Sequence, residues 1–473
     1  MSKENTILDN YFVYISNFSH DKAKEVVEKE RDVARVSSGS SWSQLVSVLI
    51  SLSNVEKTYH SLTFLIPRSG SVFLRKDPSL KSVYQSLIVD CRNAMEAGPT
   101  SDRRSELSQV CDDLARIFQV RARMTDIYER LCNLTQQAFL TETFSVEIPS
   151  LTTILTELKK NKSKVLGSWL LVLKYEVEVM LDFLTLILTM QDFNFFDSII
   201  LLQRAGETLN KWDEVVQVIF FISLFISLPT TYISVCQARE TRKLGFASSW
   251  LRVSGSVEPQ LYTWFQRLKS SLLSKFSLYF HSTLSGQTNT QEMRSLCSKL
   301  STDQTARLSS FQKRLDAGSV SILYDANGQP GYQVTYESFY CYSIITFSIN
   351  RLIAHQGRPG YHFHDKDQVS LSGLDLFPLV YSAGFPPGPH WPNVVMIISD
   401  HSEELLRDST VTFYDMRVEA TYFLHQIEPR FYVVIVFDGR KNEKDSTINS
   451  FIQDTAISLR CSRNFSSLKP GFK

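Results

Sequence analysis

Histidines in the C-terminal third of the chain are the residues best suited to hold a metal ion. His362 and His364 alternate within Tyr-His-Phe-His-Asp, and His355 and His390 lie in the same region. Alternating histidines would share one side of a strand, and imidazole is a common zinc ligand. No second cluster has matching spacing, so surface or hydrogen-bonded histidines are the simpler interpretation. An enzyme or a metal-binding protein with its site in the His-rich loop 355–390 stays open as the alternative.

Three acidic residues could suggest paired carboxylates for general acid–base catalysis. Asp400, Asp415 and Asp438 each close a short run of β-branched and aromatic residues. Aspartates are also common turn residues, which explains the pattern more simply. The motifs G-x-x-x-x-G-K-[ST], G-x-G-x-x-G after a strand, H-E-x-x-H and G-x-S-x-G are not found in the sequence. We therefore predict no catalytic, cofactor-binding or metal-ligating residues, and no cofactor.

The C-terminal part of the chain is predicted to be a small α+β domain with a mostly antiparallel sheet. The runs 320–324, 394–398, 410–415 and 431–437 are typical of strands because each is apolar and ends at a turn signal. The continuous apolar run 431–437 suits a strand that is covered on both faces.

Other segments of the same domain show different patterns. From Asp445 to Arg460 the apolar residues recur every three or four positions, which predicts a helix that Asp445 or Ser446 caps. The segment 357–389 is rich in Gly, Pro and His and is predicted to be a loop.

The N-terminal part is predicted to be an all-α helical bundle. Apolar residues repeat at helical spacing in several long segments, a pattern typical of bundle cores. The predicted helices lie at 22–32, 41–65, after Pro78, at 107–131 and 261–280, with one or two more over 175–209. At 473 residues the chain exceeds the size of most single cores, so we expect two domains, 1–315 and 316–473.

The composition of the chain argues against a nucleic-acid-binding protein and against a secreted one. The chain has 50 Lys+Arg and 49 Asp+Glu, so no global field attracts nucleic acid. Seven scattered cysteines without a C-x-x-C pair fit a reducing compartment. The N-terminus lacks the pattern of a signal peptide, and Ser2 replaces the glycine that myristoylation requires. We therefore expect a cytoplasmic chain.

One basic cluster, Lys-Lys-Asn-Lys-Ser-Lys at 159–164, interrupts the helical pattern. It is short and contains no aromatic residue, so a helix end or a loop is the simplest interpretation. Contact with an anionic membrane surface and contact with nucleic acid are the two alternatives.

Several short strings along the chain are distinctive in their composition and order. They are SHDKAK at 19–24, VEKER at 27–31, EKTYHSLT at 56–63, RKD at 75–77, LSKFSLYFH at 273–281, residues 390–400, FYD at 413–415, TYFL at 421–424 and SLKPG at 467–471. Together they resemble one known family, the smaller scaffold subunit of the KICSTOR complex. Their specificity comes from their order along nearly the whole chain, since none of them is a catalytic motif.

The resemblance implies a scaffold without catalytic residues. The family works with kaptin, an integrin-alpha-repeat-like subunit and a very large scaffold subunit. Together they tether the GATOR complex, which has Rag-GTPase-activating activity, to the cytosolic face of lysosomes. This restrains TOR complex one when amino acids or glucose run low. The expected location is therefore peripheral at the lysosomal membrane and otherwise cytoplasmic, and the implied fold is a helical domain followed by a small α+β domain.

Two stretches, 218–237 and 334–356, depart from the family pattern. Each begins with Val, whose codons start with GT, and ends with Gln, one of whose codons is CAG. We hypothesise that both are translated introns; transcript reads that cross both segments in frame would contradict this. A membrane anchor is the alternative for 218–237, but its apolar core of about eleven residues falls short of the roughly twenty that a span requires.

Overall fold

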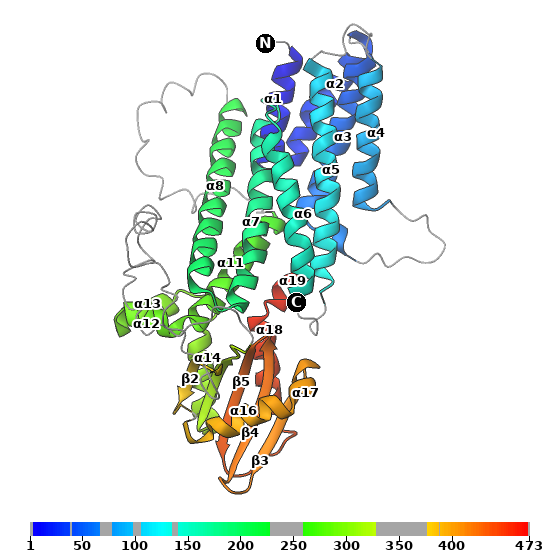
Figure 1. Ribbon diagram of the computed structural model, residues 1–473. Helices are drawn as coiled ribbons and strands as arrows, with labels where there is room; N and C mark the ends of the chain where they lie inside the picture. The colour runs from blue at the N-terminus through cyan, green and yellow to red at the C-terminus, as the bar shows by residue number, and fades with distance from the viewer. Residues whose placement is uncertain are drawn as a thin grey trace, which may run out of the picture.

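The computed structural model describes residues 3–37, 40–66, 78–97, 106–134, 141–227, 259–327, 376–386 and 388–471. Long helices form a bundle at one end of the molecule, and a five-stranded sheet lies at the other end (Figure 1). This arrangement confirms the predicted fold class, an all-α part followed by an α+β part with an antiparallel sheet.

Most of the helices precede the sheet. They are α1 (Lys3–Ser16), α2 (His20–Ser37), α3 (Ser40–His60), η1 (Thr63–Leu65), α4 (Leu80–Glu96), α5 (Glu106–Cys132), α6 (Thr141–Lys160), α7 (Gly167–Gln191), α8 (Phe195–Ser227), α11 (Gln260–Tyr279), α12 (His281–Gln287), α13 (Thr290–Cys297) and α14 (Gln304–Leu315). The other helices are η6 (Gly388–His390), α16 (Trp391–Asp400), α17 (Ser402–Leu406), α18 (Ser446–Leu459) and α19 (Ser462–Ser466).

Local signals in the sequence set several helix ends. The Ser79 side chain accepts a hydrogen bond from the backbone N–H of Ser82 and caps α4. The Asp445 side chain caps α18 by accepting from the backbone N–H groups of Thr447 and Ile448, as predicted. The basic cluster 159–164 spans the end of α6 and the turn after it, which confirms the simplest interpretation of that segment.

The sheet has the strand order β2-β1-β5-β4-β3, and all neighbouring strands are antiparallel. Its strands are β1 (Ser319–Tyr324), β2 (Leu379–Gly384), β3 (Thr410–Asp415), β4 (Ala420–Glu428) and β5 (Phe431–Asp438). The predicted strands at 320–324, 410–415 and 431–437 are therefore confirmed.

Strand β5 lies at the centre of the sheet and is buried on both faces. Phe431, Val433 and Ile435 belong to the large core that the sheet shares with the helical bundle. Tyr432 and Val434 point to the other face, where a smaller core lies between the sheet and α16 and α17. The large core runs from α1 through the bundle to α18, so side chains of both predicted domains pack in one apolar interior.

The prediction of a strand at 394–398 was wrong, because this segment belongs to helix α16. Pro392 occupies the first turn of the helix, where proline is well tolerated. Val394, Ile397 and Ile398 are spaced as one helical face and are buried against the sheet. A short β-branched run fits either structure, and here its packing against the sheet selects the helix.

Two strands were missed. Strand β2 lies within 357–389, which was predicted to be a loop, and it pairs with β1 at the edge of the sheet. Strand β4 was not predicted, although it is buried along its whole length. It carries Gln426 and Glu428, and polar residues inside a buried strand obscure its apolar pattern.

The proposed insertions lie largely beyond the described residues. Residues 218–227 continue helix α8, whereas 228–237 and 334–356 lie outside the described ranges. Within those ranges, none of the helices has the length and apolar character needed to cross a membrane. The division into domains 1–315 and 316–473 stays a prediction.

Candidate functional site

Of the four histidines that could hold a metal, only His390 lies within the described residues. His355, His362 and His364 lie outside the described residues. His390 ends η6, and its Nδ1 atom lies 2.7 Å from the Tyr422 hydroxyl on β4. Within the described ranges, no three His, Cys, Asp or Glu side chains gather closely enough to hold a metal ion.

The three strand-closing acids do not form a catalytic pair. Asp415 and Asp438 both lie opposite Ala420, on the two sides of β4, and Asp400 is the last residue of α16. The Asp415 carboxylate accepts the backbone N–H of Arg417 at 2.8 Å. This hydrogen bond holds the pKa of Asp415 below its usual value. Asp415 therefore acts as a turn residue between β3 and β4.

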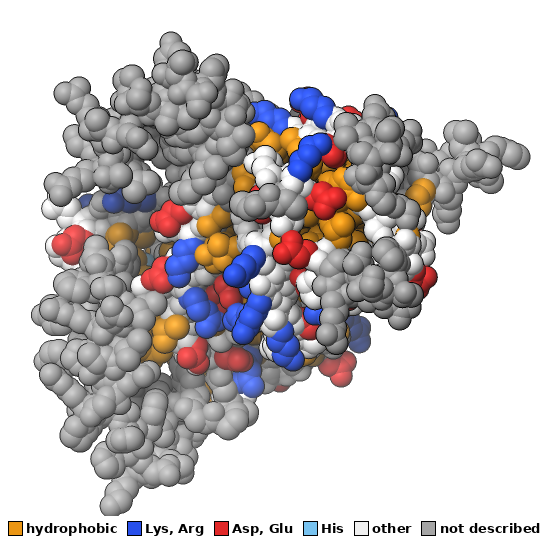
Figure 2. Space-filling model, turned by 90° about the horizontal axis from the view of Figure 1, so that it is seen from above, with side chains coloured by type: hydrophobic (Ala, Val, Ile, Leu, Met, Phe, Trp, Pro, Cys, Tyr) orange, Lys and Arg blue, Asp and Glu red, His pale blue; other side chains and the backbone are white. Residues whose placement is uncertain are grey.

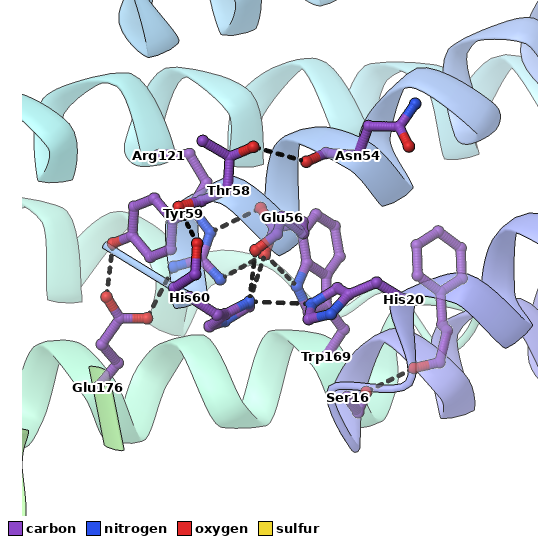
Figure 3. Close-up of polar contacts among 12 residues, drawn as sticks. Ser16, His20, Asn54, Glu56, Thr58, Tyr59, His60, Arg121, Trp169 and Glu176 are labelled. Carbon is purple, nitrogen blue, oxygen red and sulfur yellow. Dashed lines mark hydrogen bonds and ion pairs between the residues drawn. The ribbon is translucent and has the colours of Figure 1, made fainter. Parts of the chain in front are cut away.

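A charged cluster that the sequence did not reveal lies deep in the helical bundle (Figure 3). Helices α3, α4, α5 and α7 each contribute to it, and its side chains are almost completely shielded from solvent. We call it the central network. Its members are Glu56, Tyr59, Tyr84, Arg121, Tyr128, Trp169 and Glu176.

Arg121 lies between the two carboxylates of the central network. Its Nε and Nη2 atoms donate to the two oxygens of Glu56 at 3.0 and 2.8 Å, which is a bidentate pair. Its Nη1 atom donates to Glu176 Oε2 at 2.7 Å. The guanidinium also lies 4.1 Å from the centre of the Tyr59 ring. One arginine thus joins α5 to both α3 and α7.

Neutral donors add further hydrogen bonds to both carboxylates. The Tyr59 and Tyr128 hydroxyls donate to Glu176 Oε1 at 2.5 and 3.0 Å. The Tyr84 hydroxyl donates to Glu56 Oε1 at 2.8 Å. Burial, with the nearby carboxylates, raises the pKa of all three phenols well above the usual value, so the phenols stay protonated and donate.

The balance of charge keeps Arg121 ionised. Burial lowers the pKa of its guanidinium, but Glu56 and Glu176 raise it by more. Two carboxylates and one guanidinium leave the central network with one excess negative charge, spread over several hydrogen bonds. These acids are shielded from solvent, and their hydrogen bonds join the four helices α3, α4, α5 and α7.

A buried histidine pair adjoins the central network. His20 Nε2 lies 3.1 Å from His60 Nδ1, which is also 2.9 Å from the Glu56 carbonyl oxygen. Burial lowers the pKa of His20 to about 4 and holds the pKa of His60 well below its usual value. Both imidazoles are therefore neutral at physiological pH and act as polar core residues between α2 and α3.

A second buried charge pair connects the sheet to the helices. Glu428, the last residue of β4, accepts from Lys275 Nζ at 2.6 Å and from the Tyr279 hydroxyl at 2.7 Å, both on α11. Gln191, at the end of α7, donates to the same carboxylate at 3.1 Å. The Tyr279 ring also stacks on Phe431 at 4.2 Å between ring centres. We call these four hydrogen-bonding residues the helix–sheet joint.

Several of these residues lie in the strings that carry the family resemblance, where no role was predicted for them. Glu56 and Tyr59 lie in the string EKTYHSLT, and Lys275 and Tyr279 lie in LSKFSLYFH. The available signal was a charged residue on the apolar face of a helix, as at Arg121 within the stripe of α5. Such residues are rarely buried without a partner, but one sequence does not reveal the partner.

Comparison with known proteins gives the family resemblance an independent basis. A family profile described as "KICSTOR complex C12orf66 like" matches residues 1–343 and 343–473. The chain is 35% identical over 487 aligned residues to "KICSTOR subunit 2" of Danio rerio, covering 100% of this chain and 97% of that protein. It is 33% identical to "KICSTOR subunit 2" of Xenopus laevis over 489 residues, covering 100% and 98%.

Proposed function

The chain belongs to the family described as KICSTOR complex C12orf66 like, and from this membership we propose that it is a non-catalytic scaffold subunit of a KICSTOR complex. The observation that carries the proposal is the similarity to KICSTOR subunit 2 over essentially the full length of both proteins. A match of that extent includes the helical part and the sheet part together.

The described structure supports a scaffold role in two ways. The charged groups of the central network and of the helix–sheet joint are engaged in joining elements, so their chemistry maintains shape. The bundle and the sheet also lie at opposite ends of one elongated body, which places separate surfaces far apart (Figure 1). Such a body can contact different partners at the same time.

We further propose partners and a location. The partners are the other KICSTOR subunits, which are kaptin, the integrin-alpha-repeat-like subunit and the very large scaffold subunit, together with the GATOR complex. In this proposal the chain helps to hold GATOR at the cytosolic face of lysosomes and thereby restrains TOR complex one. The chain itself associates with the membrane through its partners.

Deleting the chain from cells tests this regulatory role. During amino acid starvation, cells without it should lose GATOR from lysosomes by fluorescence microscopy, and phosphorylation of TOR complex one substrates should persist. Re-expression of the intact chain should restore both responses. Normal GATOR location and a normal starvation response in the deleted cells would contradict the proposed tethering.

A further inference from the structure

Strand β3 forms one edge of the sheet and carries a row of unpaired backbone groups. Among the residues that the structure describes, β3 pairs with β4 alone, and it is the last strand in the order β2-β1-β5-β4-β3. In an antiparallel strand every second residue directs its N–H and C=O groups away from the neighbouring strand. Within the described ranges, no backbone hydrogen bond other than those to β4 involves Thr410–Asp415. Such an edge is a template for a further strand.

This edge lacks the features by which proteins commonly block strand pairing, such as proline, lysine or a β-bulge. Its six residues, TVTFYD, include neither proline nor lysine. Its register against β4 runs without interruption. Strand β2 at the other edge differs, because a bulge between Ile322 and Leu323 interrupts its register with β1. Of the two edges, β3 is therefore the one suited to pairing.

Exposed apolar side chains lie at both ends of β3. Leu406, the last residue of α17 and shortly before the strand, is 57% exposed. Met416 and Val418, in the turn after the strand, are 81% and 46% exposed. Arg407 beside Leu406 pairs with Glu403 at 3.8 Å, so its charge is balanced within the chain. Each end of the edge thus offers apolar surface that a second chain can cover.

The described part of the helical bundle contrasts with this edge. Its helices bond their own backbone groups along their length. At the bundle end remote from the sheet, Lys and Arg side chains are mixed with Asp, Glu and hydrophobic side chains (Figure 2). Neither feature selects a particular kind of partner, whereas the β3 edge selects an extended strand.

The sequence of β3 is suited to pair with itself. Two identical antiparallel strands are related by a two-fold axis, and residues opposite each other lie on the same face of the sheet. With the axis at Thr412, this residue lies opposite its own equivalent. Phe413 then lies opposite Val411 of the other copy, and Tyr414 lies opposite Thr410. Pairs of β-branched and aromatic residues stabilise neighbouring strands.

Antiparallel pairing also brings the exposed apolar ends together. The start of one strand lies beside the end of the other, so Leu406 of each copy approaches Met416 and Val418 of the other. The strands run roughly along the long axis of the molecule (Figure 1). Because the paired strands are antiparallel, the two bundles point in opposite directions and do not occupy the same space.

We propose that two copies of this chain associate through their β3 edges, which joins the two five-stranded sheets into one continuous sheet across a two-fold axis. A second copy fits this edge better than an unrelated extended segment, because it supplies the complementary strand and apolar side chains at both ends. The inference goes beyond the proposed function and does not depend on it. It gives the scaffold two equivalent bundles at opposite ends.

Sedimentation velocity of the full chain tests this pairing. We expect the wild type to shift from monomer to dimer as its concentration rises. Thr412→Lys places two like charges opposite each other at the two-fold axis, so it should raise the Kd of the dimer by about tenfold or more. Leu406→Glu with Met416→Glu should also weaken the dimer. The matched control, Val89→Glu with Val146→Glu, changes two side chains on α4 and α6 that are 51% and 66% exposed, and it should associate like the wild type.

A cysteine at the proposed two-fold axis gives an independent readout. Under mild oxidation in dilute solution, Thr412→Cys should form a disulfide-linked dimer, because the two equivalent side chains lie opposite each other. The wild type and Thr447→Cys, an exposed position on α18, should stay unlinked.

Circular dichroism and thermal unfolding should show that the variants fold like the wild type. If Thr412→Lys does not fold, the double variant at Leu406 and Met416 carries the test, since both side chains are exposed.

Three results would overturn the inference. The first is a wild-type chain that stays monomeric at about 100 μM, where a pairing of even modest affinity would be visible. The second is a dimer that the folded β3 variants leave intact. The third is a monomer whose β3 amides become protected from hydrogen exchange only when other KICSTOR subunits bind, which would assign the edge to a strand of another protein. Recovery of those subunits by a chain that does not dimerise removes only this inference and leaves the proposed function standing.

Discussion

Replacing Arg121 with methionine should lower the free energy of unfolding by about 3–5 kcal/mol, the cost of removing one partner of a buried charge pair. Arg121 supplies three of the hydrogen bonds in the central network, two to Glu56 and one to Glu176. Without it both carboxylates stay buried with only neutral donors. Methionine fills a similar volume, so the loss reflects charge and hydrogen bonding more than a cavity.

Urea denaturation followed by circular dichroism measures this effect. Arg116→Met is the matched control, because Arg116 lies on the same helix with a side chain that is 61% exposed. The control should change stability by about 0.5 kcal/mol or less, as surface substitutions usually do. Equal losses in the two variants would show that the central network does not hold the bundle together.

A triple variant separates charge from packing. Glu56→Gln, Arg121→Met and Glu176→Gln together remove every formal charge from the central network while keeping its approximate volume. Replacing a whole buried ion cluster is often tolerated better than removing one member. The triple variant should therefore be more stable than Arg121→Met alone.

Replacing Lys275 with methionine should destabilise the chain by about 3 kcal/mol or more, because Glu428 would remain buried without its cation. Lys275 and Glu428 are 1% and 2% exposed, so water does not substitute for the lost partner. Tyr279 and Gln191 would still donate to the carboxylate. The expected consequence is a weakened connection between α11 and the end of β4.

Hydrogen exchange with mass spectrometry locates that effect. Faster exchange should appear in β4, β5 and α11, at the helix–sheet joint, while α3 and α5 stay protected. Arg267→Met, an exposed position on the same α11, is the control and should exchange like the wild type. Uniform acceleration throughout the bundle would contradict a local role for Lys275.

The sequence was sufficient to predict those elements whose apolar pattern fits only one type of secondary structure. Helix α5 was predicted at 107–131 and spans Glu106–Cys132, and its stripe faces the core along its whole length. Strand β5 was predicted to be covered on both faces, and it is. In these segments local periodicity and tertiary burial agree, so the pattern was sufficient.

Prediction failed where burial depended on distant partners. The run 394–398 fits a strand or a helix, and only its packing over the sheet selects the helix. The central network unites residues from α3, α5 and α7 that are more than 50 positions apart in sequence. Side-chain pairing over such separations leaves no periodic signal in a single chain, so neither the network nor the helix–sheet joint was predicted.

Affinity purification of the tagged chain from fed and starved cells, with mass spectrometry of the proteins that co-purify, tests the proposed scaffold function most directly. A scaffold subunit should recover the other KICSTOR subunits in comparable amounts under both conditions, together with GATOR components. Recovery of none of these proteins, from a chain that circular dichroism shows to be folded, would contradict it.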